Sequence, residues 1–162
     1  MQAIATIVLT VTVFHLATSR FSFGLEAQEE ACLPYTLFVI DKKDTSVALG
    51  DFVAFYADER TRPWFEPGTL MIKEVRATAG DRIRIEKGQM FINDAEVDYG
   101  RIDPEVVSKI EEKKKVTPSF DREMVLEEMR FWVMGNQPRT FDSRYWGPIS
   151  SEQIVGQAYP LF

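Results

Sequence analysis

The most informative stretch of this sequence lies near its end and runs Phe131-Trp132-Val133-Met134-Gly135-Asn136-Gln137-Pro138-Arg139-Thr140-Phe141-Asp142-Ser143-Arg144-Tyr145-Trp146-Gly147. An aromatic, strand-like run opens the stretch, and a polar turn between two glycines follows it. Asp142 and Arg144 lie two positions apart in that turn, close enough for charge-assisted hydrogen bonds. The pattern predicts a polar site fixed by these two side chains between aromatic strands.

The chain before this stretch consists of short apolar or alternating runs that are broken by Gly, Asp and Pro, which indicates a mostly β fold. In Arg82–Glu86, apolar and charged residues alternate, as they do in a half-exposed strand. Turn pairs such as Gly80-Asp81 separate the runs. The strands that we predict are Thr36–Ile40, Phe52–Tyr56, Leu70–Arg76, Arg82–Glu86, Met90–Ile92, Arg130–Met134 and Gln153–Tyr159.

The segment Pro104–Met129 differs from the rest because it is rich in charge. Glu111 and Lys115 stand at i and i+4, a spacing that supports a solvated helix. We therefore expect one or two surface helices in an exposed insertion. A lid or a substrate-docking element is the alternative.

The N-terminal segment Ala3–Ala17 carries no charged side chain, and Arg20 follows it. The run is short for a bilayer span of about 20 residues, but extension through Phe21 and Phe23 would place Arg20 near an interface. Three interpretations remain open: an uncleaved anchor, a cleaved export signal, or a buried helix. We assign residues 1–25 to an anchor or signal segment, and residues 26–162, which begin with a polar stretch, to the folded domain.

The composition excludes several classes of function. The chain has 162 residues and a net charge of −6, which disfavours a binder of nucleic-acid phosphates. A single Cys and a single His exclude an internal disulfide and a zinc site built from these residue types. Because His15 lies in the apolar N-terminal run, catalysis must proceed without imidazole. We expect no nucleic-acid partner, no cofactor and no metal.

Without histidine, a lysine is the natural base for a Ser, Thr or Cys nucleophile, provided that its amine is neutral. Burial among apolar groups favours the neutral form, so we searched for a lysine on an apolar strand. Lys73 fits best, because Met71, Lys73 and Val75 share one face of the predicted strand. A solvent-facing lysine on an edge strand is the alternative. Cys32, in turn, is either a small apolar core residue or a nucleophile.

Several segments, in order, resemble the bacterial type I signal peptidases, which use a Ser/Lys dyad. Val133–Asn136 followed by Phe141–Gly147 resembles the family's Met-Gly-Asp-Asn and Asp-Ser-Arg-Tyr-Trp-Gly. Lys73, with Gly80-Asp81 beginning seven positions later, resembles its lysine box, and Met90–Asp98 resembles its Tyr-Ile-Asn-Gly segment with a trailing Val-Asp.

The nucleophile box carries the main departure from the family. Cys32-Leu33-Pro34 falls where the family has Ser-x-x-Pro, or Ser-Leu-Pro in the conjugative-transfer (TraF-like) branch, and Cys32 precedes Lys73 by 41 positions, as in compact members. The family serine is therefore a cysteine here. Glu74 stands where an Arg commonly follows the lysine, and Gly135-Asn136-Gln137-Pro138 replaces Gly-Asp-Asn-Arg.

The resemblance implies a fold of coiled antiparallel sheets forming a partial barrel, with residues 104–129 as a small cap and an N-terminal transmembrane helix. It implies that Cys32 is the nucleophile and Lys73 the general base. A thiol is intrinsically nucleophilic and needs less help from its base than a hydroxyl does.

The remaining site residues also follow from the resemblance. Thr140 would orient the Lys73 amine. The other residues that would support the site are Asp142, Arg144 and Gly135. Leu33 and Pro34 would line substrate pockets together with the strand Phe52–Tyr56.

The expected function is that of a membrane-anchored endopeptidase that cleaves exported preproteins, with a pilin precursor in conjugative transfer as the specific candidate. Its partners would be that precursor, the membrane and a type IV secretion machinery. It would lie in the bacterial inner membrane as a single-pass protein, with the catalytic domain on the periplasmic side. The alternatives are an inactive relative that binds a pilus component without cutting it, and a soluble domain.

Overall fold

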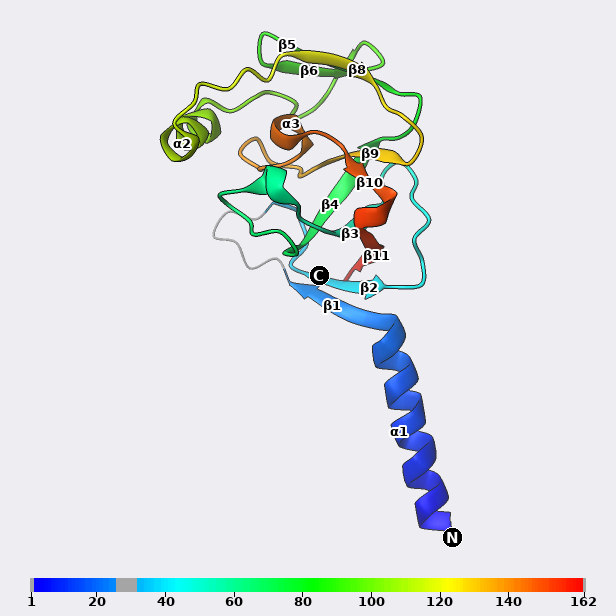
Figure 1. Cartoon of the computed structure of the whole chain (residues 1–162). Helices are drawn as coiled ribbons and strands as arrows, with labels where there is room; N and C mark the ends of the chain where they lie inside the picture. The colour runs from blue at the N-terminus through cyan, green and yellow to red at the C-terminus, as the bar shows by residue number, and fades with distance from the viewer. Residues whose placement is uncertain (1, 26–31, 162) are drawn as a thin grey trace.

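The computed structural model describes residues 2–25 and 32–161. Helix α1 (Gln2–Arg20) projects as a stalk from a body made mainly of antiparallel strands (Figure 1). The body contains a seven-stranded sheet and a four-stranded sheet, and the four-stranded sheet lies at the end far from α1. Among the described residues both sheets end in edge strands, so neither closes into a barrel.

The seven-stranded sheet has, in spatial order, β1 (Phe21–Leu25), β2 (Leu37–Asp41), β11 (Ile154–Pro160), β3 (Phe52–Tyr56), β4 (Leu70–Ala77), β9 (Arg130–Met134) and β10 (Ile149–Ser150). The four-stranded sheet has β7 (Ala95–Glu96), β6 (Gln89–Ile92), β5 (Arg82–Glu86) and β8 (Arg122–Val125). The mostly β fold is confirmed. Each of the seven predicted strands is present within two residues at either end.

Two segments differ from the expectation. Residues 21–25, which we grouped with the anchor, form β1 and pair with β2, so the helix ends at Arg20. The prediction of helices throughout Pro104–Met129 is wrong in its second half, because Arg122–Val125 pairs with β5 as strand β8. Both strands depend on a partner distant in sequence, which local patterns do not reveal.

Helix α2 (Pro104–Lys114) occupies the first half of that charged segment. The Asp103 carboxylate caps its N-terminus by accepting from the backbone N–H groups of Glu105 and Val106, and Pro104 needs no partner at the first position. The helix buries Val106 and Ile110 and leaves its charged residues outside. It is therefore a surface helix held by one apolar edge.

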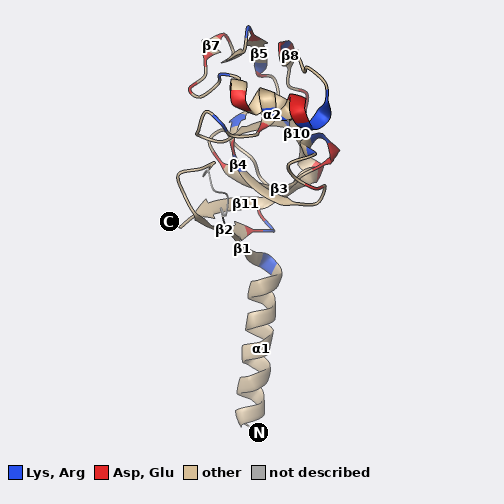
Figure 2. Cartoon of the chain, turned by 90° about the vertical axis from the view of Figure 1, so that its left-hand side faces the viewer, with Lys and Arg blue, Asp and Glu red and all other residues tan. Residues whose placement is uncertain are grey.

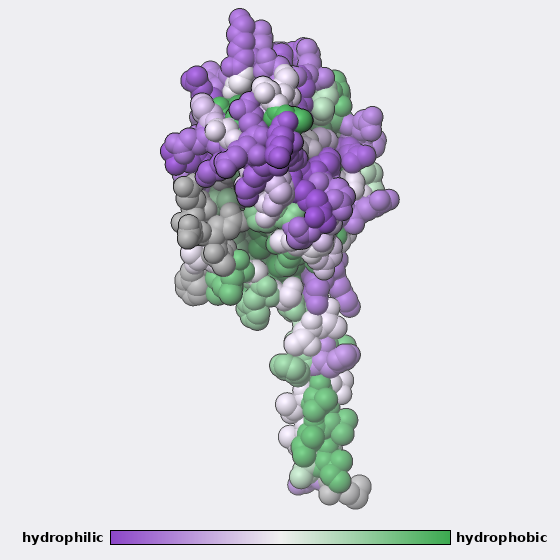
Figure 3. Space-filling model, turned by 60° about the vertical axis from the view of Figure 1, so that its left-hand side comes forward, coloured by the Kyte–Doolittle hydropathy of each residue, from purple (hydrophilic) through white to green (hydrophobic). Residues whose placement is uncertain are grey.

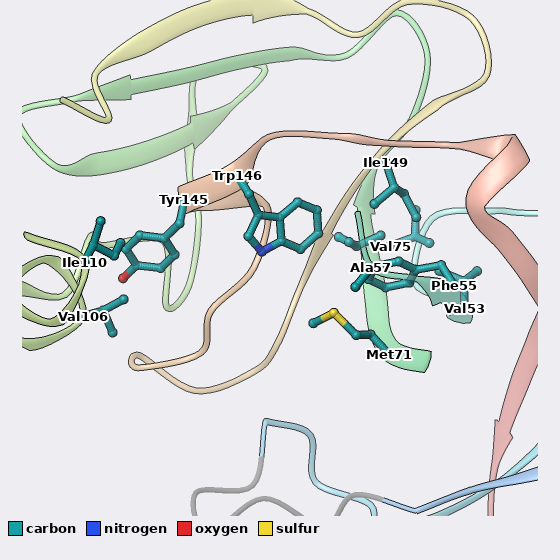
Figure 4. Close-up of a cluster of buried hydrophobic side chains, with 11 residues drawn as sticks. Val53, Phe55, Ala57, Met71, Val75, Val106, Ile110, Tyr145, Trp146 and Ile149 are labelled. Carbon is teal, nitrogen blue, oxygen red and sulfur yellow. The ribbon is translucent and has the colours of Figure 1, made fainter. Parts of the chain in front are cut away.

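A hydrophobic cluster packs α2 and the short helix α3 (Ser143–Trp146) onto the seven-stranded sheet. Figure 4 shows the Tyr145 ring beside Val106 and Ile110 of α2, and the Trp146 ring between Tyr145 and the side chains of β3 and β4. Each large side chain buried here contributes about 1.5–3 kcal/mol of transfer free energy. This packing fixes α3 and therefore the turn that precedes it.

Charge and hydropathy divide the molecule along its length. Charged residues are frequent in α2 and the four-stranded sheet, whereas α1 is uncharged up to its end next to the body (Figure 2). Apolar atoms cover much of α1 and reappear at the base of the body (Figure 3). Among the described residues, α1 alone is long and apolar enough to cross a membrane, and none of it is buried. That exposure contradicts the buried-helix interpretation.

Candidate active site

Strand β4 presents Lys73 to the interior of the protein. The strand alternates strictly, with Met71, Lys73, Val75 and Ala77 buried and the residues between them partly or fully exposed. Only 2% of Lys73 is exposed. The structure therefore places this lysine on the core-facing side, as the shared face with Met71 and Val75 predicted, and not on a solvent-facing edge.

The register of β4 against β9 determines what faces this lysine. Glu74 pairs with Met134 and Val75 with Val133. Continued by one residue on each strand, the antiparallel register sets Lys73 opposite Gly135. The lysine thus lies where β9 ends and the Gly-bounded turn begins.

Gly135 and Asn136 connect this point to the backbone of Cys32. The Asn136 N–H donates to the Cys32 carbonyl oxygen at 3.0 Å. A Cβ atom on Gly135 would lie 2.6 Å from the same oxygen and 2.5 Å from Thr140 Cγ2, so no side chain fits there. The absence of a side chain at position 135 is what allows the backbone of Cys32, Thr140 and the end of β9 to converge.

The Asp142–Arg144 ion pair forms the centre of the turn. Both side chains are fully buried, and Arg144 Nε donates to Asp142 Oδ1 at 2.8 Å. The Asp142 carboxylate also accepts from the Gly135 N–H at 3.1 Å and from the Thr140 hydroxyl at 2.5 Å. One carboxylate thereby fixes the residue opposite Lys73, the hydroxyl of Thr140 and the start of α3.

Arg144 also ties the turn to a distant loop. Its Nη1 donates to the carbonyl oxygens of Tyr99, Arg101 and Pro138, and its Nη2 to the carbonyl oxygen of Thr140. Burial alone would lower the pKa of Arg144, but the charge and hydrogen bonds of Asp142 outweigh it and the pKa is raised. The guanidinium therefore stays charged and keeps all of these contacts.

Thr140 has hydrogen-bonding capacity beyond the ion pair. Its hydroxyl accepts from Arg144 Nη2 at 2.7 Å and has one proton to donate, for which Asp142 is the nearest acceptor. A hydroxyl oxygen has two acceptor lone pairs, so one remains. Thr140 approaches Gly135, which the register sets opposite Lys73.

Cys32 and Leu33 lie in a different environment from Pro34. Cys32 is 4% exposed and Leu33 is 2% exposed, and both belong to a cluster with Phe38, Ile40, Ala54 and Ala158. Pro34 is exposed. Ile72, next to Lys73 on β4, packs against the same cluster, so the apolar surroundings of the thiol extend to the lysine strand.

A pocket of about 380 Å³ borders Lys73. Its lining comes mainly from two strands: β1 contributes Phe23–Leu25 and β4 contributes Leu70–Lys73. Among the described residues, Cys32, Leu33 and Pro34 are not part of this lining. Phe38, Phe65 and Thr69 complete the pocket wall.

Among the described residues, both strands beside the pocket have open edges. Within that part of the chain β1 is the edge strand of its sheet, and the Leu70–Lys73 half of β4 pairs only with β3, because its ladder with β9 begins at Glu74. Unpaired backbone groups on such edges can take up an extended peptide. The alternation in Phe21–Leu25 is a local signal for a strand, but it does not indicate β2 as partner or the pocket wall.

The described residues contain no group of three or more His, Cys, Asp or Glu side chains that could hold a metal ion. The site is instead an arrangement of a buried amine, a thiol and a buried ion pair at the end of β9. Glu26–Glu30, the polar stretch that opens the expected catalytic domain, lies outside the described residues.

Comparisons with known proteins agree on one family. The chain is 30% identical over 97 residues to thylakoidal processing peptidase 1 of Arabidopsis thaliana, covering 58% of this chain and 25% of the relative. It is 25% identical over 93 residues to a probable signal peptidase I-2 of a Synechocystis strain, covering 56% of this chain and 37% of the relative. The matches therefore span well under half the length of these relatives.

A signal peptidase I from Enterococcus faecalis is similar in structure, with 20% identity, a TM-score of 0.42, and coverage of 69% of this chain and 96% of the other. The model of the signal peptidase family, peptidase S26, matches residues 1–162. The chain therefore belongs to the signal peptidase family, peptidase S26.

Proposed function

We propose that this protein is a membrane-anchored endopeptidase that removes N-terminal segments from exported preproteins, with Cys32 as nucleophile and Lys73 as general base. The observation that carries the proposal is the burial of Lys73 on the core face of β4, at the register position opposite Gly135. Burial of a charged amine costs free energy unless the amine is paired or hydrogen-bonded, and burial favours its neutral form, which can act as a base. Membership of a peptidase family supports the same conclusion.

The reaction needs only these two residues and backbone groups. The neutral amine of Lys73 accepts the thiol proton as Cys32 Sγ attacks the scissile carbonyl carbon. The resulting ammonium donates that proton to the departing amine, which leaves a thioester between Cys32 and the substrate. Lys73 then takes a proton from water, the hydroxide attacks the thioester, and the proton returns to Cys32.

The proposed assignment of supporting residues follows the geometry of the turn. Asp142 and Arg144 hold the turn, Gly135 lets it approach Cys32, and Thr140 offers its remaining lone pair to the lysine ammonium. The backbone N–H of Cys32 is the donor proposed for the oxyanion. These residues position the reacting groups without touching the scissile bond, apart from Cys32.

The substrate is proposed to bind as an extended strand in the pocket between β1 and β4. The open edges of Phe23–Leu25 and Leu70–Lys73 supply backbone partners, and the modest volume of the pocket suits small side chains next to the cut. Leu33 and Pro34 adjoin Cys32 in the chain, and we propose that they border the peptide on the nucleophile side. The pocket wall itself comes from β1 and β4.

The finer assignment is to the conjugative-transfer branch, with a pilin precursor as substrate and a type IV secretion machinery as partner. It rests on the Cys32-Leu33-Pro34 box and on the compact spacing to Lys73. We further propose that α1 is an uncleaved single-pass anchor in the bacterial inner membrane. The body that follows it, from β1 onward, would be the periplasmic catalytic domain, in which 104–129 forms a partly helical cap. The length, apolar composition and exposure of α1 support its assignment as an anchor.

The test uses the full chain in detergent or lipid with a purified pilin precursor, and the products are read by mass spectrometry. Wild type should cleave once, whereas Cys32→Ala and Lys73→Met should each lose more than about a hundredfold in rate. Lys87→Met, at an exposed position between β5 and β6 that does not line the pocket, is the matched lysine control and should cleave normally. Unchanged processing by Lys73→Met would contradict the dyad.

Cys32→Ser separates a tuned thiol from a tolerated one. If the site is adapted to sulfur, the serine variant should be slower, and a thiol-alkylating reagent should inactivate wild type while leaving the serine variant unaffected. A serine variant faster than wild type would show that the cysteine merely replaces the family nucleophile.

The second candidate is an assembly protein that keeps the fold and binds a pilin or secretion component without cutting it. The observation in its favour is the low exposure of Cys32, 4%, together with its absence from the described lining of the pocket. Under this alternative wild type and Cys32→Ala would both bind the precursor and neither would cleave it.

A further inference from the structure

The junction between α1 and the body contains no linker. α1 ends at Arg20, and β1 begins at the next residue, Phe21. The ladder between β1 and β2 pairs Phe21 with Asp41, and the backbone N–H of Lys42 extends it by donating to the Arg20 carbonyl oxygen at 2.8 Å. The last helical residue is therefore hydrogen-bonded to the seven-stranded sheet.

Side chains on the same short stretch of β2 lock the helix end. Arg20 Nε donates to both carboxylate oxygens of Asp41 at 3.0 Å, and its Nη2 donates to one of them at 2.6 Å. Asp41 is only 5% exposed, and these hydrogen bonds hold its pKa below its usual range. Lys42 Nζ donates to the Thr18 carbonyl oxygen at 2.9 Å, which satisfies a C-terminal helix carbonyl.

The same strand leads directly to the pocket. Phe23, Gly24 and Leu25, the third to fifth residues after the helix, line the pocket wall. At about 3.3 Å per residue, the wall begins about 10 Å along the strand from the end of α1. Gly24 lies close to β4, because a Cβ atom there would be 2.4 Å from Ile72 Cδ1.

A flexible connection between anchor and body would let the pocket occupy many heights above a membrane. The hydrogen-bonded junction described above favours a single height. We propose that the contacts of Arg20, Asp41 and Lys42 hold the pocket at a fixed height and direction relative to the bilayer. The junction then selects substrates by the number of residues between their membrane-inserted apolar segment and the bond that is cut. The proposal rests on the proposed function, because it concerns substrates of that pocket.

The experiment uses the full chain in lipid vesicles with precursors whose spacing between apolar segment and cleavage site changes in one-residue steps. Wild type should show a sharp optimum of spacing. Asp41→Asn should flatten this optimum. Precursors whose spacing lies two residues from the optimum should gain about tenfold in cleavage rate relative to the best precursor. This is the factor that corresponds to the loss of one charge-assisted hydrogen bond. A short water-soluble peptide should be cleaved at the same rate by both.

Matched variants separate the junction from general damage. Asp94→Asn makes the same chemical change at an exposed ion pair with Arg82 in the body and should keep the wild-type optimum. Arg20→Lys keeps the charge but loses the two-pronged contact, so it should give an intermediate profile. A folded Asp41→Asn protein with the sharp wild-type optimum, or a wild type that cuts all spacings equally, would overturn the proposal.

A second measurement does not depend on activity and distinguishes failure of this inference from failure of the proposed function. Spin labels at Leu9→Cys and Val116→Cys, in a Cys32→Ser background, report the distance between α1 and the body. The distribution should be narrow with Asp41 and broad with Asp41→Asn. A broad distribution with Asp41 present contradicts the rigid junction. A narrow distribution, combined with no cleavage by the unlabelled protein that retains Cys32, contradicts the proposed function and with it the role in substrate selection.

Discussion

One arginine–aspartate pair lies at the junction of α1 with the body and another lies in the turn before α3. The two pairs differ in their exposure to solvent. In the Arg144–Asp142 pair both side chains are 0% exposed, whereas in the Arg20–Asp41 pair the arginine is 49% and the aspartate 7% exposed. Attraction between the buried charges is barely screened, but each depends on the other for its solvation. In the half-exposed Arg20–Asp41 pair solvent weakens the attraction between the charges, so the pair acts mainly by fixing the direction of α1 relative to β2.

The difference shows how one chemical pair serves two purposes. Around Arg144 the pair is a hub, because carbonyl groups from two loops and the hydroxyl of Thr140 all bind it. Around Arg20 the pair is a clamp between two elements, α1 and β2. Loss of the hub should damage fold and site together, whereas loss of the clamp should leave the body folded.

The largest effect is expected for Arg144→Gln. Asp142 would keep its bonds from Gly135 and Thr140 but would remain as a buried charge without a counter-ion, at a cost of about 3–5 kcal/mol. That is a large share of the total stability of a domain of this size. Denaturant unfolding of the detergent-solubilised chain, followed by tryptophan fluorescence, measures the change.

Arg144→Lys and the double variant Arg144→Gln/Asp142→Asn serve as controls for this prediction. The lysine keeps the charge but lacks the planar fork, so it should recover only part of the loss. The double variant removes both charges and should be more stable than Arg144→Gln alone. A stability of Arg144→Gln equal to that of wild type would show that the buried pair is not the hub that the contacts indicate.

Gly135→Ala should come next and should separate the site from the hub. The new methyl would meet the Cys32 carbonyl oxygen and Thr140 Cγ2, a form of overpacking that costs about 1–3 kcal/mol. Cleavage should fall by about a hundredfold, because displacement by about 1 Å misaligns nucleophile and base. Unfolding and precursor cleavage are measured on the same preparation.

Thr140→Ser provides the companion to that variant, since it keeps the hydroxyl and removes the methyl that Gly135→Ala would strike. In the double variant Gly135→Ala/Thr140→Ser, part of the lost stability should be recovered. The contact of the new methyl with the Cys32 carbonyl should persist, and the loss of cleavage activity should persist with it. Recovery of activity along with stability would place the important contact at Thr140 instead of at Cys32.

The period of two along a strand placed Lys73 on the face of Met71 and Val75, but it left open whether that face met the core or solvent. In the structure this face is buried. Asp142 and Arg144 were predicted as a pair from their spacing of two. Both features lie within a few residues of chain, where side-chain direction follows from backbone geometry.

The features that the sequence did not reveal are all long-range. Arg20 and Asp41 are 21 positions apart, and nothing near either residue indicates the other. Strands β1 and β8 exist because β2 and β5 pair with them, and the charged run before β8 favours a helix locally. The role of Cys32 came only from resemblance, because a single thiol in an apolar context is ordinarily a core residue.

Acid should weaken the half-exposed pair before it affects the rest of the junction. Because hydrogen bonds from Arg20 lower the pKa of Asp41, the stabilisation by Asp41 is fully present above the unfolded-state pKa of about 3.9 and is lost as pH falls through the folded-state value. The stability difference between wild type and Asp41→Asn should therefore shrink from pH 6 to pH 3. Thermal unfolding across that range tests this, and a constant difference would contradict it.

The smallest effect is expected at Glu105→Gln, which completes the series from buried to exposed pairs. Glu105 on α2 accepts from Arg139 in the site turn at 2.7 Å, but the two side chains are 58% and 46% exposed. Solvent screening and side-chain entropy limit such a pair to about 0.2–1 kcal/mol. Cleavage should stay within about twofold of wild type, because Arg144, not Arg139, holds the turn.

Glu59→Gln, in an exposed pair with Arg62 outside the turn, is the control for a neutral surface change. Indistinguishable stability and cleavage in the two variants would confirm that α2 is held by Val106 and Ile110 and by its cap, with little help from charge. A loss of cleavage in Glu105→Gln alone would instead make α2 part of the site, as a lid that acts through Arg139.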